Sequence, residues 1–206
     1  MLDGWARRRI DPALDAVAGV LNGAGVSANA ITIAAFLVGA GAAAAIANGL
    51  LWLGLILILV SRLGDGLDGA VARLAGRTDL GGYLDIVLDF AFYGLIPLAF
   101  VILDPAANGV AGAVLLCAFY ANGASFLAFA IMAEKRGIIG EARGKKSLFF
   151  TTGLAEASET LAVFVAFCVL PGWFPFLACL FAAATAWTTL SRIVLAWREF
   201  AERGEQ

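Results

Sequence analysis

The fold is decided by residues 50–73, which read LLWLGLILILVSRLGDGLDGAVAR. Residues 50–60 are purely apolar, whereas the second half of the stretch contains Arg62, Asp65, Asp68 and Arg73. A helix of this length can cross the roughly 30 Å of hydrocarbon in a bilayer. Ionised carboxylates at membrane depth cost at least ~2.5 kcal/mol each, so they normally face a cavity, a cation or one another. The stretch therefore predicts a membrane helix that carries a functional site.

The rest of the chain is equally apolar. Of its 206 residues 62% are hydrophobic and 15% are charged, and the mean hydropathy is +0.90. These values are far more apolar than those of an ordinary soluble domain. We expect an all-α integral membrane protein with six transmembrane helices, near residues 29–47, 50–73, 80–103, 108–133, 153–170 and 174–197.

The N-terminal segment has a different pattern. Trp5, Ile10, Leu14, Val17 and Leu21 recur at helical spacing, as in an amphipathic helix that lies in the membrane interface. An ordinary packing helix is the alternative. We expect a single membrane-embedded domain over residues 1–206, with the interfacial helix at 1–26, the six-helix bundle at 27–197 and a cytoplasmic tail at 198–206.

Basic residues lie on alternate connections. The connections at 48–49, 104–109 and 171–172 contain no Lys or Arg, whereas those on the opposite side and both termini are basic. By the positive-inside rule both termini are cytoplasmic, which predicts a multi-pass protein of a bacterial-type cytoplasmic (inner) membrane. The net charge of −2 gives no basic field that would indicate a nucleic-acid partner.

Four aspartates form the candidate site. Asp65 and Asp68 are three residues apart, and Asp85 and Asp89 are four apart on the next span, so each pair shares a helix face. Two adjacent helices can therefore direct four carboxylates to one point. Such a group cannot stay fully ionised without positive charge between its members. Oxygen-rich clusters of this kind suit Mg²⁺, Mn²⁺ or Ca²⁺, and we take Mg²⁺ as the first choice.

Other residues near the aspartates favour a phosphate ligand. Arg73 supplies a planar fork for phosphate oxygens. Gly66, Gly69 and Gly82 cost ~1 kcal/mol each inside helices relative to alanine, and they either leave room for a ligand or permit close helix packing. The second interpretation is stronger for Gly66 than for the other two.

These residues form a recognisable signature. The pattern resembles that of the CDP-alcohol phosphotransferases (CDP-alcohol phosphatidyltransferases) at every defined position: Asp65-x2-Asp68-Gly69-x2-Ala72-Arg73-x8-Gly82-x3-Asp85-x3-Asp89. The resemblance implies transfer of a substituted phosphate, such as phosphatidyl, from a CDP-linked lipid donor such as CDP-diacylglycerol to a small alcohol, with release of CMP in phospholipid biosynthesis. It also implies a homodimer whose active site opens to the cytoplasm.

The resemblance implies a role for each signature residue. Asp65, Asp68 and Asp85 would ligate two metal ions, Mg²⁺ or Mn²⁺, and Asp89 would touch the second metal and act as the general base. Gly69 and Arg73 would hold the cytidine diphosphate, and Gly82 would leave space for the nucleotide. Asn29 and Thr32 lie in a segment, residues 27–32, that resembles one that contacts the nucleotide. The same segment has the residues of a helix N-cap, as do Thr78 and Asp79.

The acceptor is left open by the sequence. The resemblance implies a small alcohol or polyol, which in some family members carries its own phosphate. Basic residues could bind such a phosphate: Lys135, Arg136, Arg143, Lys145, Lys146 and Arg192. Topology and anionic headgroups are the simpler explanation for a basic loop. Glu156 and Glu159 could bind a polyol or an amine, or pair with Arg192 or a loop lysine. They could also be present only because the helix dipole favours acidic residues in the first turn.

Two other functions are compatible with an apolar chain that carries intramembrane carboxylates. A membrane cation or proton transporter also uses intramembrane carboxylates, but it has no need of Arg73 and paired glycines at these offsets. A membrane scaffold with a decayed site is the other, and the complete signature gives it no support.

Overall fold

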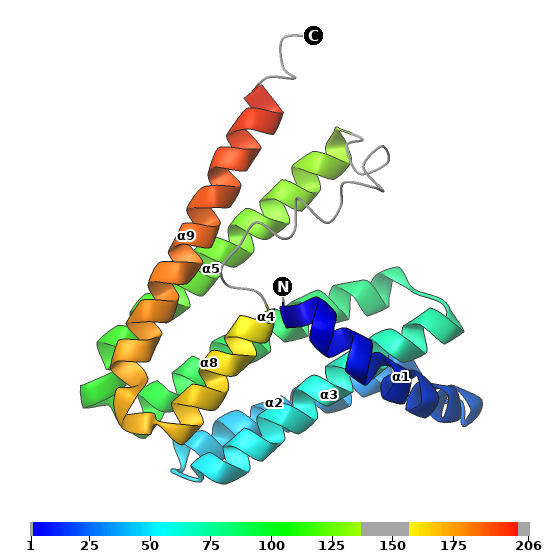
Figure 1. The fold of residues 1–206 in the computed structure, drawn as a ribbon, viewed down its shortest axis with the longest axis horizontal. Coiled ribbons are helices and arrows are strands. Elements are labelled where there is room, and N and C mark those ends of the chain that lie inside the picture. Colours follow the sequence, from blue (N-terminus) through cyan, green and yellow to red (C-terminus); the bar gives the residue numbers. More distant parts are fainter. Residues whose placement is uncertain (1, 137–156, 202–206) are drawn as a thin grey trace. The chain divides into compact units, whose positions relative to one another are not determined.

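The computed structural model describes residues 2–136 and 157–201, and the side chains from residue 12 onward except that of Ala201. All the regular structure in these residues is helical. The helices are α1 (Leu2–Gly23), α2 (Ala28–Ala47), α3 (Leu51–Ala75), α4 (Asp79–Leu103), α5 (Pro105–Lys135), α8 (Ala157–Val169), the 3₁₀ turn η1 (Pro171–Trp173) and α9 (Phe174–Ala201) (Figure 1).

Within the described residues a helix lies in each predicted range. Four helical runs are long and apolar enough to cross a membrane: α2, α4, α5 and the run Pro171–Phe200. α3 is not in this group, because Arg62, Asp65 and Asp68 add charge to its second half. The described part of α8 has 13 residues, and the first residues of the span expected at 153–170 lie outside the described part of the chain. Six spans and the orientation of the termini therefore stay predictions.

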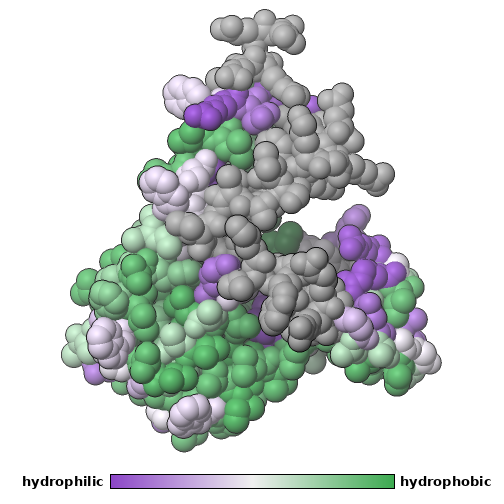
Figure 2. All heavy atoms as spheres, in the orientation of Figure 1, coloured by the Kyte–Doolittle hydropathy of each residue, from purple (hydrophilic) through white to green (hydrophobic). Residues whose placement is uncertain are grey.

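The chain forms two compact units. The first comprises Met1–Gly109 and Phe164–Pro171, and the second comprises Val110–Val163 and Gly172–Gln206. In the first unit α2 packs against α3 and α4, and α1 packs against α3. Apolar side chains cover the surface over α2, α3 and α8, and hydrophilic ones gather near α1 and the start of α4 (Figure 2). Large apolar residues such as Leu37, Trp52 and Ile56 are exposed, as a membrane protein requires.

Local sequence explains where the first helices begin and end. Ser27 is the N-cap of α2 and accepts a hydrogen bond from the Ala30 backbone N–H, and Thr78 caps α4 in the same way through the Gly81 N–H. Both predicted caps are thus confirmed. After α2, Gly49 turns the chain toward α3 with a φ of 80°, a conformation that favours glycine.

Small residues bring α2 close to α3. A Cβ on Gly54 would lie 2.5 Å from Cγ1 of Ile46, and one on Gly64 would lie 2.8 Å from the Cβ of Ala35. On the other side, aromatic rings of α4 meet those of α8, with Phe92 edge-on to Phe164 and Phe100 edge-on to Phe167. This packing sets the rotation of α3 and α4, the two helices that carry the aspartates.

Candidate active site

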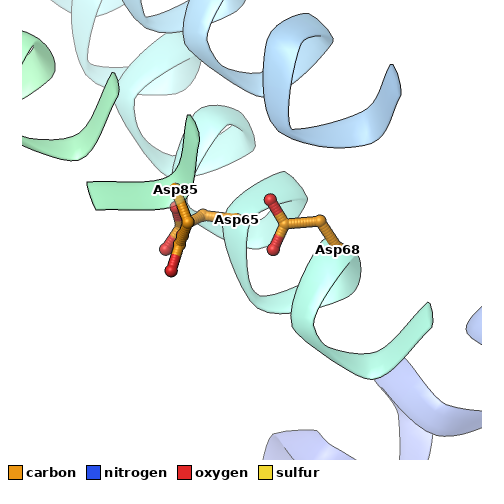
Figure 3. A group of neighbouring side chains, drawn as sticks. All are labelled: Asp65, Asp68 and Asp85. Atoms are coloured by element: carbon orange, nitrogen blue, oxygen red, sulfur yellow. The ribbon is translucent and has the colours of Figure 1, made fainter. Parts of the chain in front are cut away.

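Three of the four aspartates meet in space. α3 contributes Asp65 and Asp68 from successive turns, and α4 contributes Asp85. One carboxylate oxygen from each lies within 4.8 Å of the others, and the three groups turn toward one another (Figure 3). The structure thus brings together three of the four aspartates that were predicted to contact metal, without Asp89. We call Asp65, Asp68 and Asp85 the three-carboxylate group.

The burial of Asp68 indicates whether the three-carboxylate group suits a cation. Its side chain is 5% exposed, and its Oδ2 is buried without a hydrogen-bond partner among the described residues. Burying a charged oxygen in this state is expensive, and proteins normally resolve it with a paired charge or a metal. Asp85 is exposed and Asp65 is intermediate, which leaves the group accessible from one side. Three carboxylates, one with an unpartnered oxygen, fit a hard divalent cation such as Mg²⁺.

Asp89 lies outside the three-carboxylate group and has a cation of its own. Arg62 Nη1 donates a hydrogen bond to Asp89 Oδ1 at 2.6 Å, and the same nitrogen lies 3.5 Å from Asp65 Oδ2. The sequence prediction for Asp89 took no account of Arg62. The sequence does indicate such a pair, because an arginine at membrane depth, one turn before Asp65, needs an anionic partner.

A pocket of about 600 Å³ opens beside the aspartates. It is lined by Asp68 and Asp85 from the three-carboxylate group. All five residues that the sequence predicted to hold the donor also line it: Asn29, Thr32, Gly69, Arg73 and Gly82. Two stretches that are about 40 residues apart in sequence, at the start of α2 and the end of α3, therefore form one cavity with the start of α4.

The N-termini of two helices help to line this pocket. Ser27, Ala28 and Asn29 come from the start of α2, and Thr78, Gly81 and Gly82 come from the start of α4. A helix N-terminus carries partial positive charge and unpaired N–H groups, which favour an anion. Gly81 is tightly enclosed, because a Cβ there would lie 3.0 Å from both Asn29 Oδ1 and Thr78 Oγ1. Close approach of α2 and α4 thus depends on glycine at this position.

The structure separates the three signature-region glycines by role. A Cβ on Gly82 would meet nothing within 4 Å, and one on Gly69 would meet only Arg73 Nη1 at 3.9 Å, so both face open pocket. A Cβ on Gly66 would lie 3.1 Å from Leu14 Cδ1 of α1, which makes Gly66 a helix-packing residue. The expected difference between Gly66 and the other two is confirmed in the space around them.

Arg73 reaches the pocket while it is paired with α1. Its Nη2 lies 2.9 Å from Asp15 Oδ1, and both side chains are about half exposed. The apolar side of α1 packs nearby, where Ala18 meets Ala70 and Val71 of α3. Because the ion pair is exposed, a bound phosphate can compete with Asp15 for Arg73 at little cost.

The second unit holds the remaining acceptor candidates. Arg192 Nη1 donates to the Asn122 backbone and side-chain oxygens at 3.1 and 3.0 Å and to Ser125 Oγ at 2.8 Å. Arg136 donates to the Phe200 carbonyl oxygen at 2.9 Å. Glu159 accepts a hydrogen bond from Ser158, at the start of α8. Glu156, Arg143, Lys145 and Lys146 lie outside the described residues.

Two known proteins are similar to this chain in sequence. The chain is 42% identical over 193 residues to the inner membrane protein YnjF of Escherichia coli, covering 94% of each chain. It is 31% identical over 199 residues to archaetidylinositol phosphate synthase of Methanothermobacter thermautotrophicus, covering 93% of this chain and 90% of that one.

A solved structure shares the fold. The crystal structure of Mycobacterium tuberculosis phosphatidylinositol phosphate synthase (PgsA1) with CDP-DAG bound superposes with a TM-score of 0.69 at 22% identity, covering 89% of this chain and 93% of that one. The profile of the CDP-alcohol phosphatidyltransferase family matches residues 25–197, a range that includes the three-carboxylate group and the whole pocket. The chain therefore belongs to the CDP-alcohol phosphatidyltransferase family.

Proposed function

We propose that this protein transfers a phosphatidyl-type group from a CDP-linked lipid donor such as CDP-diacylglycerol to the hydroxyl of a small alcohol, releasing CMP, in phospholipid biosynthesis. One observation carries the proposal. Every residue predicted to bind the donor lines a single pocket, and that pocket adjoins three carboxylates suited to a divalent metal. Membership in a transferase family favours this reaction over cation or proton transport.

The pocket residues would hold the nucleotide end of the donor. Asn29 and Thr32 at the start of α2 contact the nucleotide, and the N-termini of α2 and α4 favour its diphosphate. Arg73 exchanges Asp15 for a phosphate oxygen. Gly69 and Gly82 leave space that a larger side chain would occupy. These contacts would hold the donor diphosphate beside the carboxylates.

Asp65, Asp68 and Asp85 would hold Mg²⁺ or Mn²⁺, with Asp89 reaching a second ion of the pair. When bound, such ions neutralise phosphate oxygens and stabilise charge that develops in a displacement at phosphorus. Asp68 has the clearest claim to a ligand role, because its Oδ2 is buried and unpartnered among the described residues.

Asp89 would act as the general base. Its carboxylate takes the proton of the acceptor hydroxyl while that oxygen bonds to the phosphorus that carries the lipid. The bond from this phosphorus to the bridging oxygen breaks, and CMP leaves with that oxygen. Atoms and charge balance, because the donor anhydride becomes one phosphodiester and one phosphomonoester. Oδ1 of Asp89 is engaged by Arg62, so Oδ2 is the oxygen available for the proton.

The names of two relatives narrow the choice of acceptor to test first. One is an archaetidylinositol phosphate synthase and the other a phosphatidylinositol phosphate synthase. Inositol phosphate is therefore the first acceptor that we propose to test. Arg192 stays a candidate contact on the grounds of its charge, and within the second unit it donates hydrogen bonds to Asn122 and Ser125.

For the setting of the reaction, we propose a single-domain, multi-pass protein of the inner membrane, with six spans, cytoplasmic termini, an active site open to the cytoplasm and a homodimeric assembly. Four apolar helices of sufficient length support a membrane location, as does the inner membrane protein YnjF among the relatives.

The test is direct. The purified full-length chain in lipid nanodiscs is mixed with CDP-diacylglycerol, Mg²⁺ and one alcohol at a time: inositol phosphate, inositol, glycerol phosphate or serine. CMP release and a new lipid are measured together. We expect CMP release and a new lipid with one of these acceptors. The Asp85→Asn variant is the control and should give neither. CMP release that needs no alcohol would indicate hydrolysis instead, and no CMP with any alcohol would contradict the proposal.

A further inference from the structure

Arg62 is a cation inside the site to which the family signature assigns no role. Its side chain is 13% exposed, and its Nη1 faces two carboxylates, Asp89 at 2.6 Å and Asp65 at 3.5 Å. A guanidinium this deeply buried needs anionic partners. Because Arg62 lies next to Asp65, its positive charge competes with any metal that Asp65 holds.

The surroundings fix the position of this guanidinium. Arg62 lies over the Phe92 ring, with 3.9 Å between Cζ and the ring centroid, and its Nη2 lies 3.4 Å from Ser61 Oγ. Phe92 is buried, and Ser61 is held by a hydrogen bond to the Ala35 carbonyl oxygen at 2.8 Å. The Nε atom is buried without a partner among the described residues, and the contacts with the carboxylates are made through Nη1. Arg62 therefore cannot swing aside without losing this packing.

This placement divides the four aspartates into two sets. Asp65, Asp68 and Asp85 form the group suited to a metal, whereas Asp89 is hydrogen-bonded to Arg62. The same nitrogen contacts both sets, because it lies between Asp89 and Asp65. A cation at this point weakens the pull of the carboxylates on a metal and holds Asp89 in one orientation.

We propose that Arg62 is a positioning residue: it fixes Oδ1 of Asp89 so that Oδ2 faces the acceptor hydroxyl, and it limits how strongly the aspartates bind metal. The proposal rests on the proposed function for the role of Asp89 as base. The proposal predicts two opposite effects of removing Arg62: metal binding should become stronger, and turnover should become slower. A residue that only holds α3 against α4 would weaken both.

The first experiment compares Arg62→Gln and Arg62→Lys with the wild-type chain and with Arg198→Gln, a matched loss of positive charge in the last turn of α9. Mn²⁺ affinity is measured alone, by electron paramagnetic resonance, and kcat and the donor KM are measured from CMP release. We expect Arg62→Gln to bind Mn²⁺ about tenfold more tightly and to lose about 10²-fold in kcat with little change in KM. Arg62→Lys keeps the charge, so its Mn²⁺ affinity should stay near wild type and its kcat should recover in part.

The second experiment tests whether Arg62 acts through Asp89. If it does, Arg62→Gln should cost little further kcat in an Asp89→Asn background, a coupling that a double-mutant cycle measures. The double variant also removes both charges of the pair, so it should fold even if Arg62→Gln alone leaves a destabilising unpaired charge. It should still bind Mn²⁺ more tightly than Asp89→Asn, because Asp65 loses a competing cation.

Unchanged or weaker Mn²⁺ binding in Arg62→Gln, or the same loss of kcat in both backgrounds, would overturn the proposal. Failure of the proposed function would give a different result. The wild-type chain would then release no CMP, while the Mn²⁺ affinities would still show whether Arg62 weakens metal binding.

Discussion

Arg73 of α3 is hydrogen-bonded to Asp15 of α1, with 2.9 Å between Nη2 and Oδ1. The pair links the N-terminal helix to the pocket, because Arg73 is one of its lining residues. The two side chains are about half exposed, so the pair contributes little to stability and can open when a phosphate arrives.

The first prediction concerns this pair. Asp15→Asn should change the free energy of unfolding by less than ~1 kcal/mol and should lower the donor KM, because Arg73 is freed for phosphate. Arg73→Gln should raise the donor KM about tenfold or more, since a charge-assisted hydrogen bond is lost. Thermal melting and CMP release at varied CDP-diacylglycerol check both. A raised KM in Asp15→Asn would show instead that Asp15 helps to place Arg73.

The second prediction uses the open space at Gly82. Alanine should fit there without a clash and should raise the melting temperature, because alanine is ~1 kcal/mol better than glycine in a helix. The same methyl group should raise the donor KM about tenfold, since it projects into the pocket.

Gly109→Ala is the matched control. Gly109 also lies in a helix with nothing within 4 Å of an added Cβ, but it does not line the pocket. It should gain stability at an unchanged KM. Equal kinetics for the two variants would argue against a donor in this pocket.

The third prediction concerns metal at Asp68. Chelation should stop CMP release by the wild-type chain and added Mg²⁺ should restore it. Asp68→Asn should lose Mn²⁺ binding, and without metal it should melt no lower than wild type, because it removes a buried and unpartnered charge. Mg²⁺ should then raise the melting temperature of the wild type alone. Glu134→Gln, at an exposed position on α5, is the control for a lost carboxylate.

The fourth prediction separates Asp89 from the other aspartates. Asp89→Asn should retain donor binding and the Mn²⁺ held by Asp65, Asp68 and Asp85, because Asp89 lies outside that group. Its kcat should fall by roughly 10²- to 10⁴-fold, the usual contribution of a general base. Normal turnover in this variant would show that another group accepts the proton.

Much of the site could be predicted from local spacing. Asp65 and Asp68 are three residues apart on one helix, so their shared face follows from helix geometry alone. Ser27 and Thr78 were predicted as N-caps because a cap involves only neighbouring backbone groups. The family resemblance added the donor residues, three from the signature and two from the segment at 27–32, and all five line the pocket.

Contacts between helices could not be predicted in this way. Whether Gly66 faces a ligand or Leu14 depends on how α1 lies on α3, and no local pattern reports that. The partner of Asp89 depends on the rotation of α4, which is set in part by Phe92 packing against Phe164. The span expected at 108–133 extends as α5 from Pro105 to Lys135, since helix ends depend on caps and neighbours as well as on hydropathy.

The sequence by itself determined a helical membrane protein with aspartates on two consecutive helices and the signature of a CDP-linked transferase, because periodicity, hydropathy and spacing are local properties of the chain. Only the tertiary structure decided that Asp65, Asp68 and Asp85 form one group while Asp89 pairs with Arg62. The division depends on the relative rotation of α3 and α4, which arises from side-chain packing between segments far apart in sequence.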